Sequence, residues 1–151
     1  MFAKDTEQLT NELTATRDVK TFLDDNTENF RNFDLAEYLK RMLDEKNLTK
    51  AQVIRDSQLD EGYAQHIFGG RKNPSREKIL SLALSMKLSL KETDSLLYCA
   101  GHKKLYPRDE RDAVIIFALE NRKTVLQTNE LLSDLNFEPL HASQEFCIQN
   151  Y

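Results

Sequence analysis

Residues 47–75, NLTKAQVIRDSQLDEGYAQHIFGGRKNPS, decide the fold that this sequence predicts. Thr49 and Gln52 stand three residues apart, which is the spacing of a capping box at the start of a helix. Asp60 is placed to begin a second helix, which has an apolar inner face and ends at the glycine pair 69–70. The stretch therefore predicts two short helices joined by a tight turn.

Apolar residues continue at helical spacing on both sides of this stretch. Upstream, Asp34 is a suitable N-cap for a helix that extends to about residue 46. Downstream, Ser75 follows a proline and is placed to cap a fourth helix, and a fifth helix covers about residues 90–100. With only four Gly and three Pro in the chain, this pattern predicts an all-α domain over residues 34–105.

The segment from residue 47 to residue 84 resembles the Cro and phage-repressor family, also called the XRE type. The resemblance rests on Leu48-Thr49 at the start of the second helix, on the tight turn, and on the glycines, basic residues and Asn73-Pro74-Ser75 before the fourth helix. It implies a lambda-repressor-like five-helix helix-turn-helix domain, extended here by a C-terminal helical hairpin. It also implies a sequence-specific transcriptional regulator that binds double-stranded operator DNA as a homodimer.

The same resemblance indicates which residues would contact DNA. They are Lys50 on the first helix of the pair, Glu61, Gly62, Gln65 and His66 on the outer face of the second, and Arg71, Lys72 and Asn73 after it. A glutamine can pair with the edge of an adenine, so we expect Gln65 to contact a base. We expect Lys50 to hold a phosphate and the three residues after the helix to meet the DNA backbone.

Several residues of this stretch depart from the family pattern. Lys50 and Gln58 stand where family members usually carry Gln and Gly, and a turn without glycine is expected to be strained or differently shaped. Asp56, Asp60 and Glu61 lie where phosphates or base edges would be, and a carboxylate repels phosphate. These departures favour an alternative function, a protein-protein interaction module on the helix-turn-helix scaffold.

The first 33 residues are polar and rich in threonine, and they predict an arm with one or two weak helices. Thr14, Thr16 and Thr21 are candidate sites for a kinase, because a phosphate there would create a docking site for an arginine-lined pocket. The alternative is a plain disordered arm, in which threonine is also common. Residues 141–151 are expected to form a loosely held tail.

The second half of the chain repeats at an offset of 35 residues. Placing Arg76 on Arg111 pairs Ile79 with Val114, Leu80 with Ile115, Leu97 with Leu132 and Leu105 with Leu140. Each copy predicts a helical hairpin, although two amphipathic helix pairs also match by chance. The second hairpin, residues 106–140, is expected to pack on the preceding domain or to form a dimer surface. Its apolar run from residue 114 to residue 119 suits a buried core helix equally well.

The net charge of the chain is −4, and its distribution is uneven. Only residues 34–105 are basic, with 13 Lys and Arg against 10 Asp and Glu, and a binder of nucleic acid needs such local positive charge. The start lacks the pattern of a signal peptide, and no stretch is long and apolar enough for a membrane span. The sequence therefore predicts a cytoplasmic protein without membrane contact.

Enzymatic chemistry is not indicated. The sequence has no triad order, phosphate-binding loop or HExxH string, and its cysteines, Cys99 and Cys147, lack metal-ligand spacing. His102 is expected in a solvated loop, and residues 108–112 are expected to form a solvated turn with weak local ion pairs. We therefore expect no catalytic residue, no cofactor and no metal.

Overall fold

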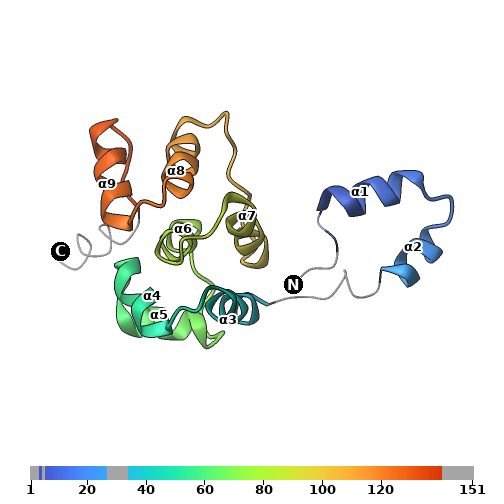
Figure 1. Ribbon diagram of the computed structural model, residues 1–151, viewed down its shortest axis with the longest axis horizontal. Coiled ribbons are helices and arrows are strands. Elements are labelled where there is room, and N and C mark those ends of the chain that lie inside the picture. Colours follow the sequence, from blue (N-terminus) through green and yellow to red (C-terminus); the bar gives the residue numbers. More distant parts are fainter. Residues whose placement is uncertain (1–3, 5, 27–33, 141–151) are drawn as a thin grey trace. The chain divides into compact units, whose positions relative to one another are not determined.

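The computed structural model describes residue 4 and residues 6–26 and 34–140 of the 151-residue chain. The chain divides into two compact units, residues 1–33 and 34–151, and each is described by itself. Every regular element among the described residues is an α-helix (Figure 1). The predicted all-α class is therefore confirmed.

The first unit contains two short helices, α1 (Thr6–Ala15) and α2 (Val19–Asp25). Lys4 links them, because its Nζ donates to Glu12 Oε2 at 2.5 Å and to Asn26 Oδ1 at 2.7 Å. Asn26 Nδ2 in turn donates to Glu12 Oε1 at 3.1 Å. These hydrogen bonds therefore connect the two weak helices that the sequence pattern allows in this segment.

The second unit consists of three layers of helices (Figure 1). The layers are α3 (Leu35–Lys46), α4 (Lys50–Ser57) and α5 (Glu61–Phe68); then α6 (Arg76–Ser85) and α7 (Leu90–Cys99); then α8 (Glu110–Glu120) and α9 (Val125–Asp134). In the first layer, α4 packs on α6 and α3 packs on α7. In the third, α8 packs on both middle helices and α9 packs on α6, so the second hairpin covers the first. The tail predicted for residues 141–151 lies outside the described residues.

Side chains next to each helix start explain where the helices of the first layer begin. Asp34 and Thr49 each accept a hydrogen bond from the backbone N–H three residues further on, at 2.8 Å and 3.2 Å. Asp60 and Ser75 cap α5 and α6 in the same way. Each bond satisfies an N–H group that a helix start leaves unpaired, and each contributes about 1 kcal/mol.

Helix α6 lies at the centre of the unit, and helices cover it on both sides. Every residue from Lys78 to Ser85 is buried. Burying one leucine side chain contributes about 2 kcal/mol, so the three buried leucines of α6, Leu80, Leu82 and Leu84, contribute substantially to the core. The buried hydroxyls of Ser81 and Ser85 donate to backbone carbonyls of the same helix, at 3.2 Å and 2.8 Å, so they leave no unpaired polar group.

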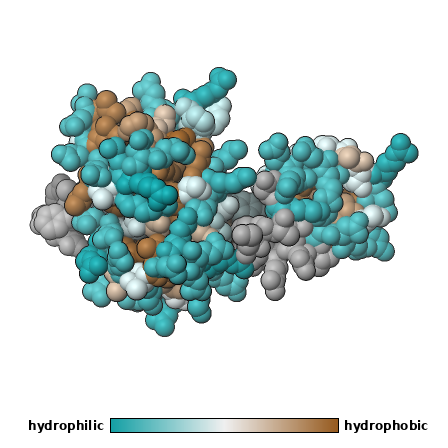
Figure 2. All heavy atoms as spheres, viewed as in Figure 1, coloured by the Kyte–Doolittle hydropathy of each residue, from teal (hydrophilic) through white to brown (hydrophobic). Residues whose placement is uncertain are grey.

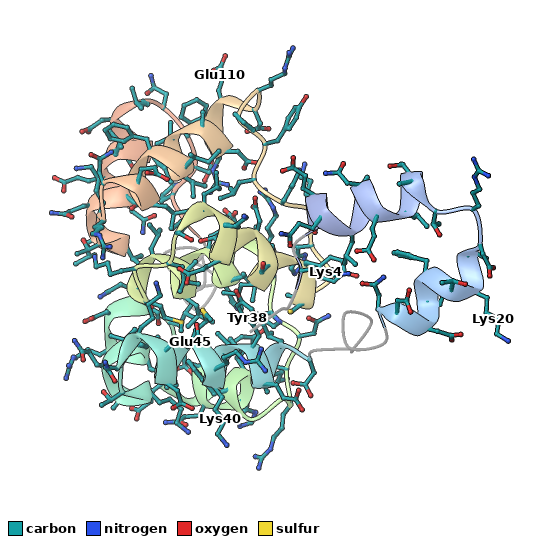
Figure 3. The ribbon with its side chains drawn as sticks, turned by 45° about the vertical axis from the view of Figure 1, so that its right-hand side comes forward. Lys4, Lys20, Tyr38, Lys40, Glu45 and Glu110 are labelled. Atoms are coloured by element: carbon teal, nitrogen blue, oxygen red, sulfur yellow. The ribbon has the colours of Figure 1, made fainter. Side chains whose placement is uncertain are left out.

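Tyr38 attaches α3 to the middle layer. Its side chain points into the unit, whereas Lys40 points away from it (Figure 3). The Tyr38 hydroxyl donates to the backbone carbonyl of Glu92 at 3.2 Å, and burial raises the pKa of Tyr38 to about 12, so the donor keeps its proton. Lys46 adds an ion pair between its Nζ and Glu92 Oε1 at 2.8 Å.

The hairpins α6–α7 and α8–α9 match at the offset of 35 in their backbone as well as in their apolar residues. Lys87 and Arg122, at equivalent positions, both have a positive φ, of 57° and 51°. Complete capping boxes begin both α7 and α9. The backbone N–H of Leu105 donates to Asp94, and that of Leu140 donates to Asn129, which stands 35 residues after Asp94. Repeated caps and turns make chance similarity of two helix pairs a poor explanation.

Two expectations for residues near the start of α8 were wrong in part. Residues 108–110 are exposed and Asp109 caps α8, as a solvated first turn requires. Asp112, however, is only 3% exposed and pairs with Arg76 of α6 instead of forming a weak local ion pair. Arg111 pairs in return with Glu77. His102 is half-buried, and its Nε2 donates to the backbone carbonyl of Pro74 at 2.8 Å. All three side chains have partners at least 28 residues away in sequence, and helical periodicity carries no information about such partners.

Candidate nucleic-acid interface

The packing of α4 and α5 determines which of their side chains face solvent. Val53 and Ile54 of α4 and Ala64 and Ile67 of α5 are buried in the second unit. Because the apolar stripe of each helix faces inward, the opposite stripe is exposed. The two helices pack on each other, and α5 also packs on α3.

A short turn at residues 58–60 joins the two helices. Gln58 has φ 64° and ψ 14°, which is the left-handed region, so a non-glycine residue does occupy a strained position as the departure from the family pattern predicted. Leu59 is buried and its N–H donates to the hydroxyl of Ser57 at 3.3 Å. The turn is therefore anchored at its centre despite the strain at Gln58.

All eight residues predicted to contact DNA are exposed. Glu61, Gly62, Gln65 and His66 lie on the outer side of α5, Arg71, Lys72 and Asn73 lie in the loop that follows it, and Lys50 begins α4. Within the described part of the chain, none of these side chains forms a hydrogen bond or an ion pair. Their polar atoms are therefore available to a binding partner.

The loop after α5 is held in place by its neighbours. Gly70 has φ 78°, which lets the chain turn away from the end of the helix, and the position of its missing Cβ is 3.6 Å from the Cβ of Ala36 on α3. Pro74 is buried, and the bond from His102 fixes its carbonyl. Arg71 and Lys72 are therefore exposed cations on a loop that is anchored at both ends.

Acidic residues at this surface differ in what they do. The carboxylate of Asp60 accepts a hydrogen bond from the backbone N–H of Tyr63 at 2.9 Å, so it caps α5 and faces the positive end of the helix dipole. Asp56 and Glu61 are exposed and have no such structural role. Arg55, which the sequence interpretation missed, is also exposed on α4 beside Asp56. Its exposure follows from the positions of Val53 and Ile54, which would have been enough to find it.

Gly62 has no structural reason to be glycine. A Cβ there would approach only Asp60 Oδ2, at 3.4 Å, which is an ordinary contact. Glycine inside a helix costs about 1 kcal/mol relative to alanine, so the position is unfavourable for stability. A residue without a side chain does, however, let a partner approach the backbone of α5 closely.

The predicted phosphorylation sites lie in the first unit, and each hydroxyl has a partner there. Thr14 donates to the backbone carbonyl of Asn11 at 3.0 Å, and Thr16 donates to that of Asp18 at 3.3 Å. Thr21 donates to the Asp18 carboxylate at 2.7 Å, so a phosphate on Thr21 would face a like charge.

Further chemistry was searched for in the described residues. No group of three or more His, Cys, Asp or Glu side chains among them is arranged to hold a metal ion. None of the helices formed by these residues has the length and apolar character needed to cross a bilayer. Comparisons with protein-family models, with curated proteins and with solved structures each found no match. The likeness to the Cro and phage-repressor family therefore rests on residues 47–84 alone.

Proposed function

We propose that this chain is a sequence-specific DNA-binding transcriptional regulator that acts as a homodimer. In this proposal α3 to α7 form a lambda-repressor-like domain, and α4 and α5 are its helix-turn-helix. One observation carries the proposal: the outer side of α5 bears polar side chains that have no partner among the described residues, and an exposed loop with Arg71 and Lys72 follows directly. Such an arrangement suits a helix that enters a major groove while the adjoining loop meets phosphates.

The proposed roles follow from side-chain chemistry. Gln65 can form paired hydrogen bonds with an adenine edge, and Glu61 can accept from the amino group of a cytosine. Lys50, Arg71 and Lys72 supply positive charge for the phosphate backbone. The proposal also accounts for the glycine at position 62, because a residue without a side chain lets the backbone of α5 approach the DNA closely.

The experiment is binding of the purified chain to genomic fragments that include its own promoter, at two salt concentrations. Gln65→Ala should remove discrimination between sequences, at a cost of about 1–3 kcal/mol at one base position. Lys50→Ala should weaken binding to all DNA sequences similarly, and it should lower the slope of log affinity against log salt concentration by about one. Lys104→Ala removes an exposed lysine of the loop between α7 and α8 and serves as the control. No binding at low salt would reject the proposal.

Gly62→Ala separates function from stability. Because the position has room for a methyl group, the free energy of unfolding of this variant should rise by about 0.5–1 kcal/mol. The variant should therefore unfold at a higher denaturant concentration. The methyl group should nevertheless weaken specific DNA binding, because it stands between α5 and the groove. A variant that is more stable and binds DNA as well as the parent would remove the functional explanation for Gly62.

A protein-protein interaction module is the second candidate. The observation that favours it is the pair of exposed carboxylates, Asp56 and Glu61, at the proposed DNA surface. Under this reading Asp56→Asn with Glu61→Gln should weaken capture of a basic partner, whereas under the regulator reading the same change should strengthen non-specific DNA binding. The two functions therefore predict opposite effects of one double variant.

A further inference from the structure

The third layer of the second unit leaves an apolar hollow between its two helices. Its lining consists of Ala113, Val114 and Phe117 of α8 and Leu131 and Leu135 of α9. Phe117 is 52% exposed and Leu135 is 49% exposed, so two large apolar side chains of one hollow both meet solvent. Figure 2 shows hydrophobic side chains at the surface in the part of the unit where α8 and α9 lie.

The internal repeat shows what this kind of face does elsewhere in the same chain. Thirty-five residues before the five lining residues stand Lys78, Ile79, Leu82, Leu96 and Ala100. Each of these earlier residues is 5% exposed or less. In that first hairpin α4 lies on α6, α3 lies on α7, and Lys78 Nζ sits 4.0 Å from the centre of the Tyr63 ring on α5. The equivalent face is thus covered by helices in the first hairpin, whereas in the second hairpin none of the described helices covers it.

We propose that the hollow between α8 and α9 is a homodimer interface, occupied by the same face of a second copy of this chain. The lining offers no charged or polar side chain, so it does not select a charged partner. It includes a half-exposed aromatic ring, Phe117, and a small residue, Ala113. A two-fold axis places the same apolar lining of two copies against each other, so each Phe117 ring can bury its exposed half against the partner copy.

The chain already pairs two of its hairpins in this manner. Arg76 of the first hairpin pairs with Asp112 of the second, and Arg111 of the second pairs with Glu77 of the first. At the offset of 35, Arg76 is equivalent to Arg111 and Glu77 is equivalent to Asp112. Each hairpin therefore gives its arginine to the acidic residue of the other, which is the pattern of contacts that a two-fold axis produces. The two hairpins of this chain therefore associate symmetrically through one face, and no described helix covers the opposite face of α8–α9.

The inference deepens the homodimer part of the proposed function, on which it rests, and names the interface. The main packing partners of α8 and α9 outside their own hairpin are α6 and α7, whereas those of α5 are α3 and α4. A dimer formed through α8 and α9 therefore leaves the outer face of α5 free in both copies.

Sedimentation velocity of the full chain from about 1 to 200 μM tests the interface without DNA. We expect a concentration-dependent dimer, and Phe117→Asp should weaken it by about thirtyfold or more, as loss of a central apolar anchor does. Tyr98→Asp is the matched control, because Tyr98 is 82% exposed on α7 and lies outside the hollow, and it should dimerise as the parent does. Circular dichroism checks that both variants stay helical, and Leu135→Ser replaces Phe117→Asp if that variant unfolds.

Three results would overturn the interface. They are a parent chain that stays monomeric over the whole range, a Phe117→Asp dimer as strong as that of the parent, and a dimer that Tyr98→Asp breaks instead. Failure of the DNA-binding proposal is separate, because it would appear as a chain that dimerises through Phe117 but binds no DNA. A monomer that binds operator DNA would reject the interface and the homodimer part of the proposed function, and it would leave the DNA-binding part standing.

Discussion

The guanidinium of Arg76 holds the carboxylate of Asp112 through two parallel hydrogen bonds, 3.0 Å from Nη1 to Oδ1 and 2.9 Å from Nη2 to Oδ2. The same carboxylate accepts the backbone N–H of Tyr106 at 3.0 Å. Arg76 also donates to the backbone carbonyls of residues 103 and 104, so one side chain ties α6 to the start of the second hairpin. The contact is bidentate and largely shielded from water, which makes it stronger than a surface ion pair.

Asp112→Asn should destabilise the chain, because it removes the charge that the Arg76 fork requires and keeps the shape of the side chain. Hydrogen bonds to charged groups contribute about 1.5–3 kcal/mol, so we expect a loss of about 2 kcal/mol in the free energy of unfolding. Denaturant titration measures it. Glu110→Gln, an exposed change on the same helix, should stay within about 0.5 kcal/mol, and equal effects of the two variants would contradict the assignment.

The pH dependence of this contribution has a definite sign. Burial alone would raise the pKa of Asp112, but the hydrogen bonds from Arg76 and from the Tyr106 N–H outweigh burial and hold it below its usual value. A carboxyl group with a lowered folded-state pKa stabilises the fold above its unfolded pKa, near about 3.9, and this stabilisation is lost as the pH falls through the folded value. The difference between the parent chain and Asp112→Asn should therefore be constant near neutral pH and shrink below about pH 4. A difference that does not change with pH would show that the charge is not responsible.

Gln58→Gly should stabilise the chain. Gln58 has φ 64°, a conformation that costs a side-chain-bearing residue about 1 kcal/mol and glycine almost nothing. The greater flexibility of glycine in the unfolded chain offsets part of this gain, so we expect the free energy of unfolding to rise by roughly 0.5 kcal/mol. Gln52→Gly is the matched control, because the same change in a helical position of α4 should cost about 1 kcal/mol. Two losses of similar size would mean that the turn is not strained.

The parts of the fold that could be predicted from the sequence are those that depend on neighbours a few residues apart. Four side chains cap helices by accepting a bond from the N–H group three residues further on, and such bonds leave a signature in the sequence itself: Asp34, Thr49, Asp60 and Ser75. The offset of 35 was equally visible, because both hairpins keep the same apolar positions.

The contacts that could not be predicted join residues distant in sequence. Arg76 and Asp112 are 36 residues apart, and Asp112 sits among charges that suit a solvated turn equally well. Only the packing of α8 on α6 brings the two together and removes water from them. At the candidate interface the sequence indicated the exposed side chains correctly, because exposure follows from helical periodicity. The pattern also places Tyr63 on the inner face of α5, but it did not indicate that the Tyr63 ring meets Lys78 of the middle layer.

Tyr63 couples the stability of α5 to the proposed DNA surface. The Nζ of Lys78 lies 4.0 Å from the centre of the Tyr63 ring, and Lys78 is almost fully buried on α6. A cation held over an aromatic ring away from water contributes about 2 kcal/mol, and Tyr63 stands on the same helix as Gln65 and His66. The ring therefore fixes the helix whose outer face would read DNA.

Tyr63→Leu should therefore lower the free energy of unfolding by about 2 kcal/mol, because it leaves the Lys78 ammonium without the ring that faces it. Tyr63→Phe keeps the ring and should change stability by less than about 0.5 kcal/mol. If α5 reads DNA, the leucine variant should also lose specific binding more than non-specific binding, since a displaced helix affects base contacts before it affects phosphate contacts. Denaturant titration measures the free energy of unfolding of both variants. Equal values for the leucine and phenylalanine variants would show that the contact between the ring and Lys78 does not stabilise the fold.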